Sequence, residues 1–291
     1  PEPVLDNSWT AQEWHEALRA CKGMTLRQEV FSFDGSVNEL VPYSAAEHNC
    51  NIQMLQPVGK NKNAVFLVTE SEAITYQYER NPDDPRIAHT LNTKIDQYGN
   101  IEESASVVYG REESNVIIEE NIDSEFIEAI KDEQIKMHII YSVNKYTNDV
   151  INNSSYRLRM PYENITYELS TKELPPEDVT LEKVKNVFDS SADILYEDEI
   201  DSNLNEKRKI KHIKILYLQD DTTSPLSEGV IESQGLVYES YKLAFTDSLV
   251  QDLFDTKVNS TKLTESGYKN LDVTEEWWIR SGNIVYLSPP E

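Results

Sequence analysis

The feature that most constrains the fold is the stretch YQYERNPDDPRIAHTLNTKIDQYGN, residues 76–100, together with the residues just before it. Ile74, Tyr76 and Tyr78 alternate with polar residues, which is the period-2 pattern of a strand with one buried face. Two prolines within residues 81–85 end that strand, because proline lacks a backbone donor and fixes φ. A second strand is expected over residues 87–95, a turn over 97–100 and a return strand over 101–109. The stretch therefore predicts an antiparallel strand, turn, strand unit.

The rest of the chain follows the same pattern, with strands interrupted by short helices. Further strands are expected over residues 26–33, 37–43, 52–55, 65–68, 137–146, 156–169, 210–218, 236–245 and 276–287. Helices are expected after the capping box of Thr10 and Glu13, near 125–131, and over 180–188 and 247–258. Asp34-Gly35 is expected to be a hairpin turn and the acidic residues 193–206 a loop. The fold class is therefore mainly β, a large antiparallel sheet with a few short peripheral helices. One region is expected to cover residues 1–291, with a possible sub-boundary near 170–180.

The charge of the chain limits its partners. There are 52 acidic residues against 27 basic ones, a formal charge of −25. A field of this sign repels phosphate backbones and anionic lipid, so we expect neither nucleic acid nor a membrane surface as a direct partner. The first residues, PEPVLDNSWT, lack the basic and apolar segments of a secretion signal peptide, and we expect the chain to be a piece of a longer protein.

The tests for catalysis and cofactor binding are largely negative, since no nucleophile elbow, phosphate loop, dinucleotide fingerprint or zinc-protease motif is present. His48 and Cys50 supply at most two metal ligands, where a structural zinc site needs about four. The adjacent acid pairs at 83–84, 220–221 and 275–276 are expected by chance in so acidic a chain. No catalytic, cofactor-binding or metal-binding residue is therefore predicted.

Two further motifs are interpreted as structural. The basic run 207–214 places His212 and Lys214 on one face of a strand, and we expect that face to be the charged outer one. Adjacent Trp277 and Trp278 point to opposite faces of a strand, so at most one is expected to be exposed. Cys21 and Cys50 are expected to be buried thiols.

Several segments, in order along the chain, resemble the middle/C-terminal region of TcdB/TcaC-type B components of bacterial insecticidal toxin complexes, a family related to SpvB-type virulence proteins. The matching segments are KGMTLRQEVFSFDG (22–35), VPYSAAEHNCNIQMLQP (41–57), AITYQYERNPDDPRIAHTLNTKIDQYGNI (73–101), SSYRLRMPYENITYEL (154–169), ILYLQDD (215–221), GLVYESYKLAFT (235–246) and EEWWIRSGNIVYLSP (275–289). A collinear series is more specific than any single short motif. The acidic stretches 112–133, 173–178 and 193–206 depart from the resemblance.

The resemblance implies a structural role. The B component, with the C component, is similar to a hollow shell of long β-strands of the Rhs/YD-repeat type, which encloses the toxic C-terminal part of the C component. This chain would be part of the shell wall, in a secreted toxin complex that contacts the pore-forming A component indirectly. Asp96, Gly99 and Asn100 resemble the D-x-x-G-N core of a YD repeat, in which Gly and Asn tolerate a left-handed backbone. We assign these three residues to a structural turn motif, and no residue to catalysis.

Two alternatives stay open at this point. The chain is also compatible with an extracellular β-rich module that binds a glycan or protein through Tyr76, Tyr78 and Trp278. A hydrolase with two acidic residues is a weaker possibility. If the chain is a piece of a shell, its sheet edges would be exposed, and we expect weak self-association at high concentration.

Overall fold

The computed structural model describes residues 6–116, 122–271, 275–282 and 284–286. Within them the chain is mostly β: an 11-stranded sheet and a separate two-stranded one, with five α-helices and three 3₁₀ turns. The pairs β1·β2, β2·β3, β3·β4, β4·β5, β9·β11, β11·β12 and β12·β13 are antiparallel, and β10 lies parallel to β11. The predicted fold class, a large antiparallel sheet with a few short helices, is confirmed. None of the described helices has the length and apolar character to span a membrane.

The chain divides into two compact units, residues 1–140 with 173–189, and residues 141–172 with 190–291. The chain passes from the second unit back to the first between residues 172 and 173, within the stretch 170–180. Strand β6 (His138–Tyr146) begins in the first unit and continues into the second.

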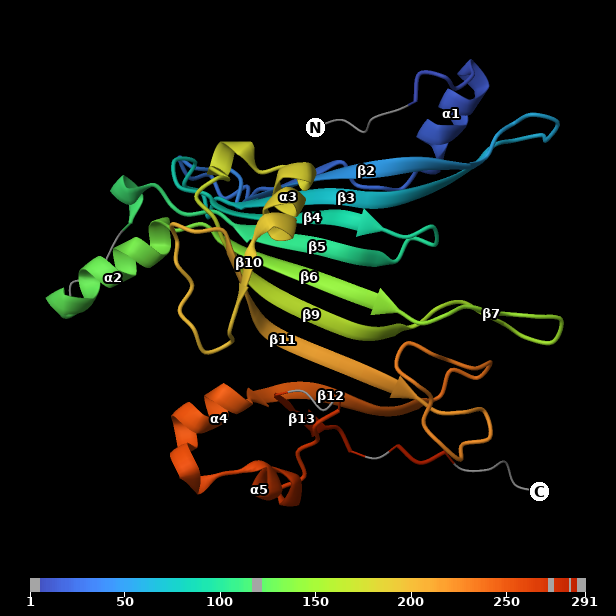
Figure 1. Cartoon of the computed structure of the whole chain (residues 1–291). Helices are drawn as coiled ribbons and strands as arrows, with labels where there is room; N and C mark the ends of the chain where they lie inside the picture. The colour runs from blue at the N-terminus through green and yellow to red at the C-terminus, as the bar shows by residue number, and fades with distance from the viewer. Residues whose placement is uncertain (1–5, 117–121, 272–274, 283, 287–291) are drawn as a thin grey trace. The chain divides into compact units, whose positions relative to one another are not determined.

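In the first unit, strands β1 to β5 are neighbours in sequence order, and Figure 1 shows β2 to β5 side by side. Its elements are α1 (Ala11–Ala20), β1 (Arg27–Val30), β2 (Ser44–Gln56), β3 (Val65–Gln77), β4 (Arg86–Ile95), β5 (Ile101–Val108), η1 (Glu113–Asn115), α2 (Ser124–Ile135), η2 (Pro176–Asp178) and α3 (Leu181–Ser190). Helix α3 lies against β5, where Lys185 Nζ is 2.9 Å from Glu103 Oε2.

Helix α1 begins where the capping box predicts. The Thr10 hydroxyl accepts from the Glu13 N–H, and the Glu13 carboxylate accepts from the Thr10 N–H at 2.9 Å. The same carboxylate accepts from the Val58 N–H at 3.0 Å, which ties the helix to the loop after β2. Ala17 is fully buried against Cys50 and Ile52 of β2, so the helix covers this part of the sheet.

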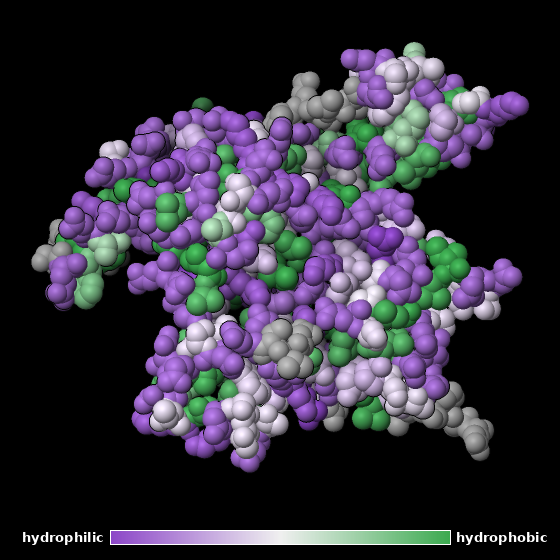
Figure 2. All heavy atoms as spheres, viewed as in Figure 1, coloured by the Kyte–Doolittle hydropathy of each residue, from purple (hydrophilic) through white to green (hydrophobic). Residues whose placement is uncertain are grey.

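In the second unit, the pairs β9·β11, β11·β12 and β12·β13 build one antiparallel run. Its elements besides β6 are β7 (Val150–Ile151), β8 (Tyr156–Arg157), β9 (Pro161–Ser170), β10 (Ala192–Ile194), β11 (Glu206–Tyr217), β12 (Val237–Thr246), α4 (Asp247–Phe254), η3 (Asp255–Lys257), α5 (Ser260–Glu265) and β13 (Glu276–Arg280). Helices α4 and α5 bury Val250 and Leu263 against Trp277 of β13. The surface seen in Figure 2 is mostly hydrophilic, in keeping with the charge of −25.

Several local predictions differ from the structure. The strand expected over 37–43 is wrong: residues 31–43 form one long connection between β1 and β2, so Asp34-Gly35 is not a two-residue hairpin turn. Arg80 holds this connection, because its guanidinium donates to Asp34 at 2.6 Å and to the Ser36 hydroxyl. Ala192–Ile194, at the start of the predicted loop 193–206, is strand β10. The last strand ends at Arg280, and residues 283 and 287 of the predicted strand lie outside the described residues.

The burial of β3 also differs from the expectation of one buried face. Ile74 and Tyr76 of β3, and Tyr78 just after it, are half-buried; of the two polar residues between them, Thr75 is half-buried as well and Gln77 is exposed. The clean alternation is found instead in β4, where His89 and Leu91 are buried and Ala88 and Thr90 are exposed. Strand β3 therefore has both faces partly covered.

Candidate functional site

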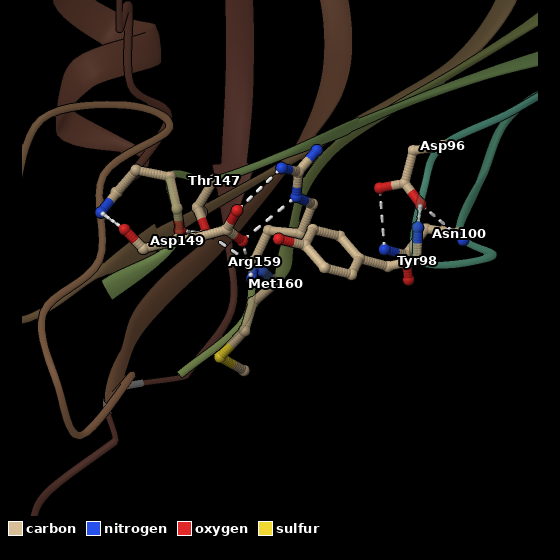
Figure 3. A network of polar contacts seen from close by, with 8 residues as sticks. Asp96, Tyr98, Asn100, Thr147, Asp149, Arg159 and Met160 are labelled. Atoms are coloured by element: carbon tan, nitrogen blue, oxygen red, sulfur yellow. Dashed lines mark hydrogen bonds and ion pairs between the residues drawn. The ribbon is translucent and has the colours of Figure 1, made fainter. Parts of the chain in front are cut away.

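The turn between β4 and β5 is organised by one carboxylate (Figure 3). Asp96 Oδ1 accepts from the backbone N–H of Tyr98 at 2.8 Å and of Asn100 at 2.9 Å. Asp96 Oδ2 accepts from the Asn100 side-chain amide at 3.0 Å. The Asp96 N–H donates to the Asn100 carbonyl at 2.9 Å, which closes the turn. The turn therefore depends on the aspartate and the asparagine acting as a pair.

Gly99 supplies the one left-handed residue of this turn, with φ of +88°. Asn100 does not share that conformation, so its contribution is hydrogen bonding rather than backbone tolerance. A Cβ on Gly99 would meet the Thr69 methyl at 3.6 Å and Leu67 at 3.9 Å, which is ordinary contact. Conformation, rather than space, therefore selects glycine at position 99.

A second carboxylate organises the connection between β6 and β9, also drawn in Figure 3. Asp149 accepts from the Arg159 guanidinium at 2.8 and 3.2 Å and from the Arg159 N–H at 2.8 Å. The Thr147 hydroxyl accepts from the Met160 N–H at 3.0 Å. Both contacts bring the start and the end of residues 147–160 together.

A row of polar side chains crosses four strands of the second unit. In the strand register, Lys214 of β11 lies opposite Glu163 of β9 on one side and opposite Tyr241 of β12 on the other. Tyr241 in turn lies opposite Arg280 of β13. Paired residues on neighbouring strands project from the same face of a sheet, so these four residues form one row. We call Glu163, Lys214, Tyr241 and Arg280 the cross-strand polar row.

Glu163 is the most connected residue of the row. It is 5% exposed, accepts from His212 Nε2 at 2.6 Å, and pairs with Lys145 Nζ at 2.5 Å. Burial pushes the pKa of Glu163 up, but the hydrogen bonds and charges of His212 and Lys145 outweigh it and leave the pKa at about 2. Glu163 is thus ionised at neutral pH and neutralised by its neighbours.

The remaining charges of the row are matched in the same way. Lys214 Nζ lies 3.0 Å from Glu228 and 5.4 Å from the centre of the Trp278 ring. Buried Glu239 accepts from the Tyr241 hydroxyl at 2.6 Å and lies 3.3 Å from Arg280. Burial, with the hydrogen bond to Glu239, raises the pKa of Tyr241. Each charge is matched by an opposite one, and the contacts of Glu163 and Arg280 link β9 to β6 and β11, and β13 to β12.

The expectation that His212 and Lys214 face solvent is wrong. They are 5% and 7% exposed, because His212 contacts Glu163, Lys214 contacts Glu228, and Trp278 covers both. Trp278 is fully buried and Trp277 is 5% exposed, so neither forms a platform for a sugar. Within the described part of the chain, His212 Nδ1 and Trp278 Nε1 have no hydrogen-bond partner. Sequence reasoning missed this row because its partners come from separate strands.

The other candidate residues take part in structural contacts. His48 Nδ1 lies 2.8 Å from Glu70, while Cys50 lies 4.0 Å from Cys21, so the two do not share a site. The described residues contain no group of three or more His, Cys, Asp or Glu that could hold a metal ion. Four of the six acidic residues in the three adjacent pairs form structural contacts: Asp84 pairs with Arg111, Asp220 accepts from Ser233, Asp221 from Thr223, and Glu276 pairs with Lys209.

Comparison with known proteins gives a family match for part of the chain. Residues 16–160 match the family described as the insecticide toxin TcdB middle/C-terminal region. These residues belong to the TcdB family. The TcdB match covers β1 to β5, the Asp96 turn and β6. No curated protein matches the chain significantly.

Solved structures match nearly the whole chain, each at 21% identity. A crystal structure of TcdB2-TccC3 matches 98% of this chain with a TM-score of 0.75, and one of TcdB2-TccC3-Cdc42 also matches 98% with a TM-score of 0.73. The structure of a Photorhabdus luminescens Tc holotoxin pore, with a mutation in TccC3, matches 97% with a TM-score of 0.72. This chain spans only 13–14% of the length of those chains. The fold is thus that of a segment of a TcdB2-TccC3 chain.

Proposed function

We propose that this chain is a non-catalytic structural segment of a toxin-complex B component, part of the β wall that encloses a toxic cargo. The observation that carries the proposal is the match of 98% of this chain to 14% of a much longer TcdB2-TccC3 chain. A chain with this relationship corresponds to a segment within a larger structure. Both units would then belong to one region of the wall.

An open strand edge in the first unit supports the proposal. Strand β1 pairs with β2, and among the described residues no strand covers its other edge. All four β1 residues are exposed. Large apolar side chains gather in and around it, namely Leu26, Val30, Phe31, Phe33, Val37 and Leu40, with exposures from 38% to 100%. We call these six residues the apolar edge. An uncovered strand with apolar neighbours is an interaction surface.

The buried charges support a structural role as well. The cross-strand polar row lies among matched opposite charges, and Glu163 is held ionised. A general acid or base that works near neutral pH needs a pKa close to 7, which that of Glu163 is not. A buried charged row instead penalises any change of strand register, because a shift would separate its pairs.

The partners follow from this role. The apolar edge would contact the remainder of the B component, and the wall would face the C component with its toxic C-terminal region. The pore-forming A component would be reached indirectly, and the assembly would act outside the bacterial cell. The turn of Asp96, Gly99 and Asn100 would be one of the YD-type turns of the wall, without nucleic acid or membrane as a direct partner.

Protease protection tests the proposal. The B component that contains this chain is co-purified with its C component, and cleavage of the C-terminal region of the C component is followed over time. We expect protection in the wild type and faster cleavage when Phe33→Ser and Val37→Ser are combined. Leu253→Ser is the matched control, because Leu253 is also exposed, at 60%, but lies on α4. Cleavage of the cargo in the wild-type complex at the rate of free cargo would overturn the proposal.

A further inference from the structure

The fold brings together two thiols that are far apart in sequence. Cys21 is the C-cap residue of α1 and Cys50 lies in β2, yet their sulfur atoms are 4.0 Å apart. Both are free cysteines, Cys21 half-buried and Cys50 buried. Ala17 and Ile52 lie in the same buried cluster. The pair is therefore one contact of the interface between α1 and the sheet.

Both cysteines lie where regular structure is interrupted. Cys21 ends the helix and is followed by a turn, and its thiol donates back to the Ala17 carbonyl at 3.5 Å. On β2, the pairing with β3 shifts register between Asn49 and Cys50. The Cys50 N–H donates to the Asn49 side chain at 2.9 Å. Since a disulfide has its sulfurs about 2 Å apart, closure requires a movement of about 2 Å shared by a helix end and a bulge.

We propose that Cys21 and Cys50 form an intramolecular disulfide under oxidising conditions, which links α1 covalently to β2. The oxidant is a small disulfide such as oxidised glutathione. The half-buried Cys21 thiolate attacks it, forms a mixed disulfide and releases one small thiol. Cys50 then loses its proton and attacks the Cys21 sulfur, which releases the second small thiol. In total, two protein thiols and one small disulfide give one protein disulfide and two small thiols.

The environment of Cys50 determines how fast the second step runs. Burial is the largest cause that raises the pKa of Cys50, and it remains when Cys21 is held in the mixed disulfide. Only the thiolate attacks, and its fraction grows about tenfold per pH unit below the pKa. Ring closure should therefore be slow at pH 7 and much faster at pH 9.

The bond would stabilise the first unit. It closes the loop between residues 21 and 50, which restricts the unfolded chain more than the folded one. For a loop of this size in a unit of this size we expect the Tm to rise by about 5–10 °C. Reduction with dithiothreitol should reverse the rise.

Intact mass spectrometry of the full 291-residue chain tests the proposal. The native protein is incubated with oxidised glutathione, denatured and alkylated. We expect a monomer in which neither cysteine is alkylated, with the Tm increase measured in parallel. Cys21→Ser should show neither effect, and Cys50→Ala should keep glutathione on Cys21. Two alkylated cysteines, a glutathione adduct that persists in the wild type, or cross-linked dimers would each overturn the proposal.

Discussion

Replacement of Glu163 by glutamine removes the charge of the most connected residue of the cross-strand polar row and keeps the shape of the side chain. The lowering of the Glu163 pKa from 4.5 to about 2 corresponds to about 3 kcal/mol of stability at neutral pH. Loss of one partner of a buried pair costs about 3–5 kcal/mol. The Lys145 side chain is 50% exposed and can be rehydrated. We therefore expect the lower end, about 3 kcal/mol, for Glu163→Gln.

The stability that Glu163 contributes decreases as the pH falls. Because the pKa of folded Glu163 lies below that of the unfolded chain, its contribution is complete above about pH 4.5 and is lost as the pH falls towards 2. The stability difference between wild type and Glu163→Gln should fall from about 3 kcal/mol at pH 7 to about 1 kcal/mol at pH 3. Urea unfolding at both pH values, followed by circular dichroism and tryptophan fluorescence, measures it.

Glu168→Gln is the matched control on the same strand, β9. Glu168 lies 2.6 Å from Arg208, but the two side chains are 24% and 26% exposed, so we expect a loss of about 1 kcal/mol or less. Equal losses for the two variants would refute the reasoning about burial. A difference between wild type and Glu163→Gln that stays constant from pH 7 to pH 3 would refute the assigned pKa.

Two further predictions concern the first unit. Gly110→Ala should cost at least about 2 kcal/mol of unfolding free energy, because its Cβ would lie 1.9 Å from a carbonyl oxygen at the end of α2. The control is Gly282→Ala, whose Cβ would have nothing within 4 Å and which should change the unfolding free energy by less than about 0.5 kcal/mol. Asp96→Ala should cost about 2 kcal/mol and speed amide exchange at Tyr98 and Asn100, whereas Asp96→Asn, which keeps an acceptor oxygen, should cost less. Equal stability losses for Gly110→Ala and Gly282→Ala, or for Asp96→Ala and Asp96→Asn, would contradict these assignments.

Sequence alone was sufficient where the determinants are local. The unit of β4, turn and β5 was predicted to within a residue or two because the prolines before it, the alternation within it and the Asp96 turn lie close together. The same holds for α1, whose cap is formed by Thr10 and Glu13. Local patterns also gave α2, α3 and α4 to within a few residues.

Sequence was insufficient where the determinants are distant. The alternation correctly places His212 and Lys214 on one face of β11 and Ile213 on the other. It does not show which of the two faces other parts of the protein cover. That depends on Glu163, which lies 49 residues from His212, and on Trp278. The connection 31–43 was misjudged for a related reason: its conformation depends on Arg80, which belongs to a later segment.

The central claim is that this chain is a segment of a continuous wall around a cargo. Electron cryomicroscopy of the B component that contains it, bound to its C component, tests this most directly. We predict that Phe33 and Val37 of the apolar edge are covered by residues outside these 291, and that the C-terminal region of the C component lies within the enclosed space. An apolar edge open to solvent, with the C-terminal region outside the assembly, would contradict the claim.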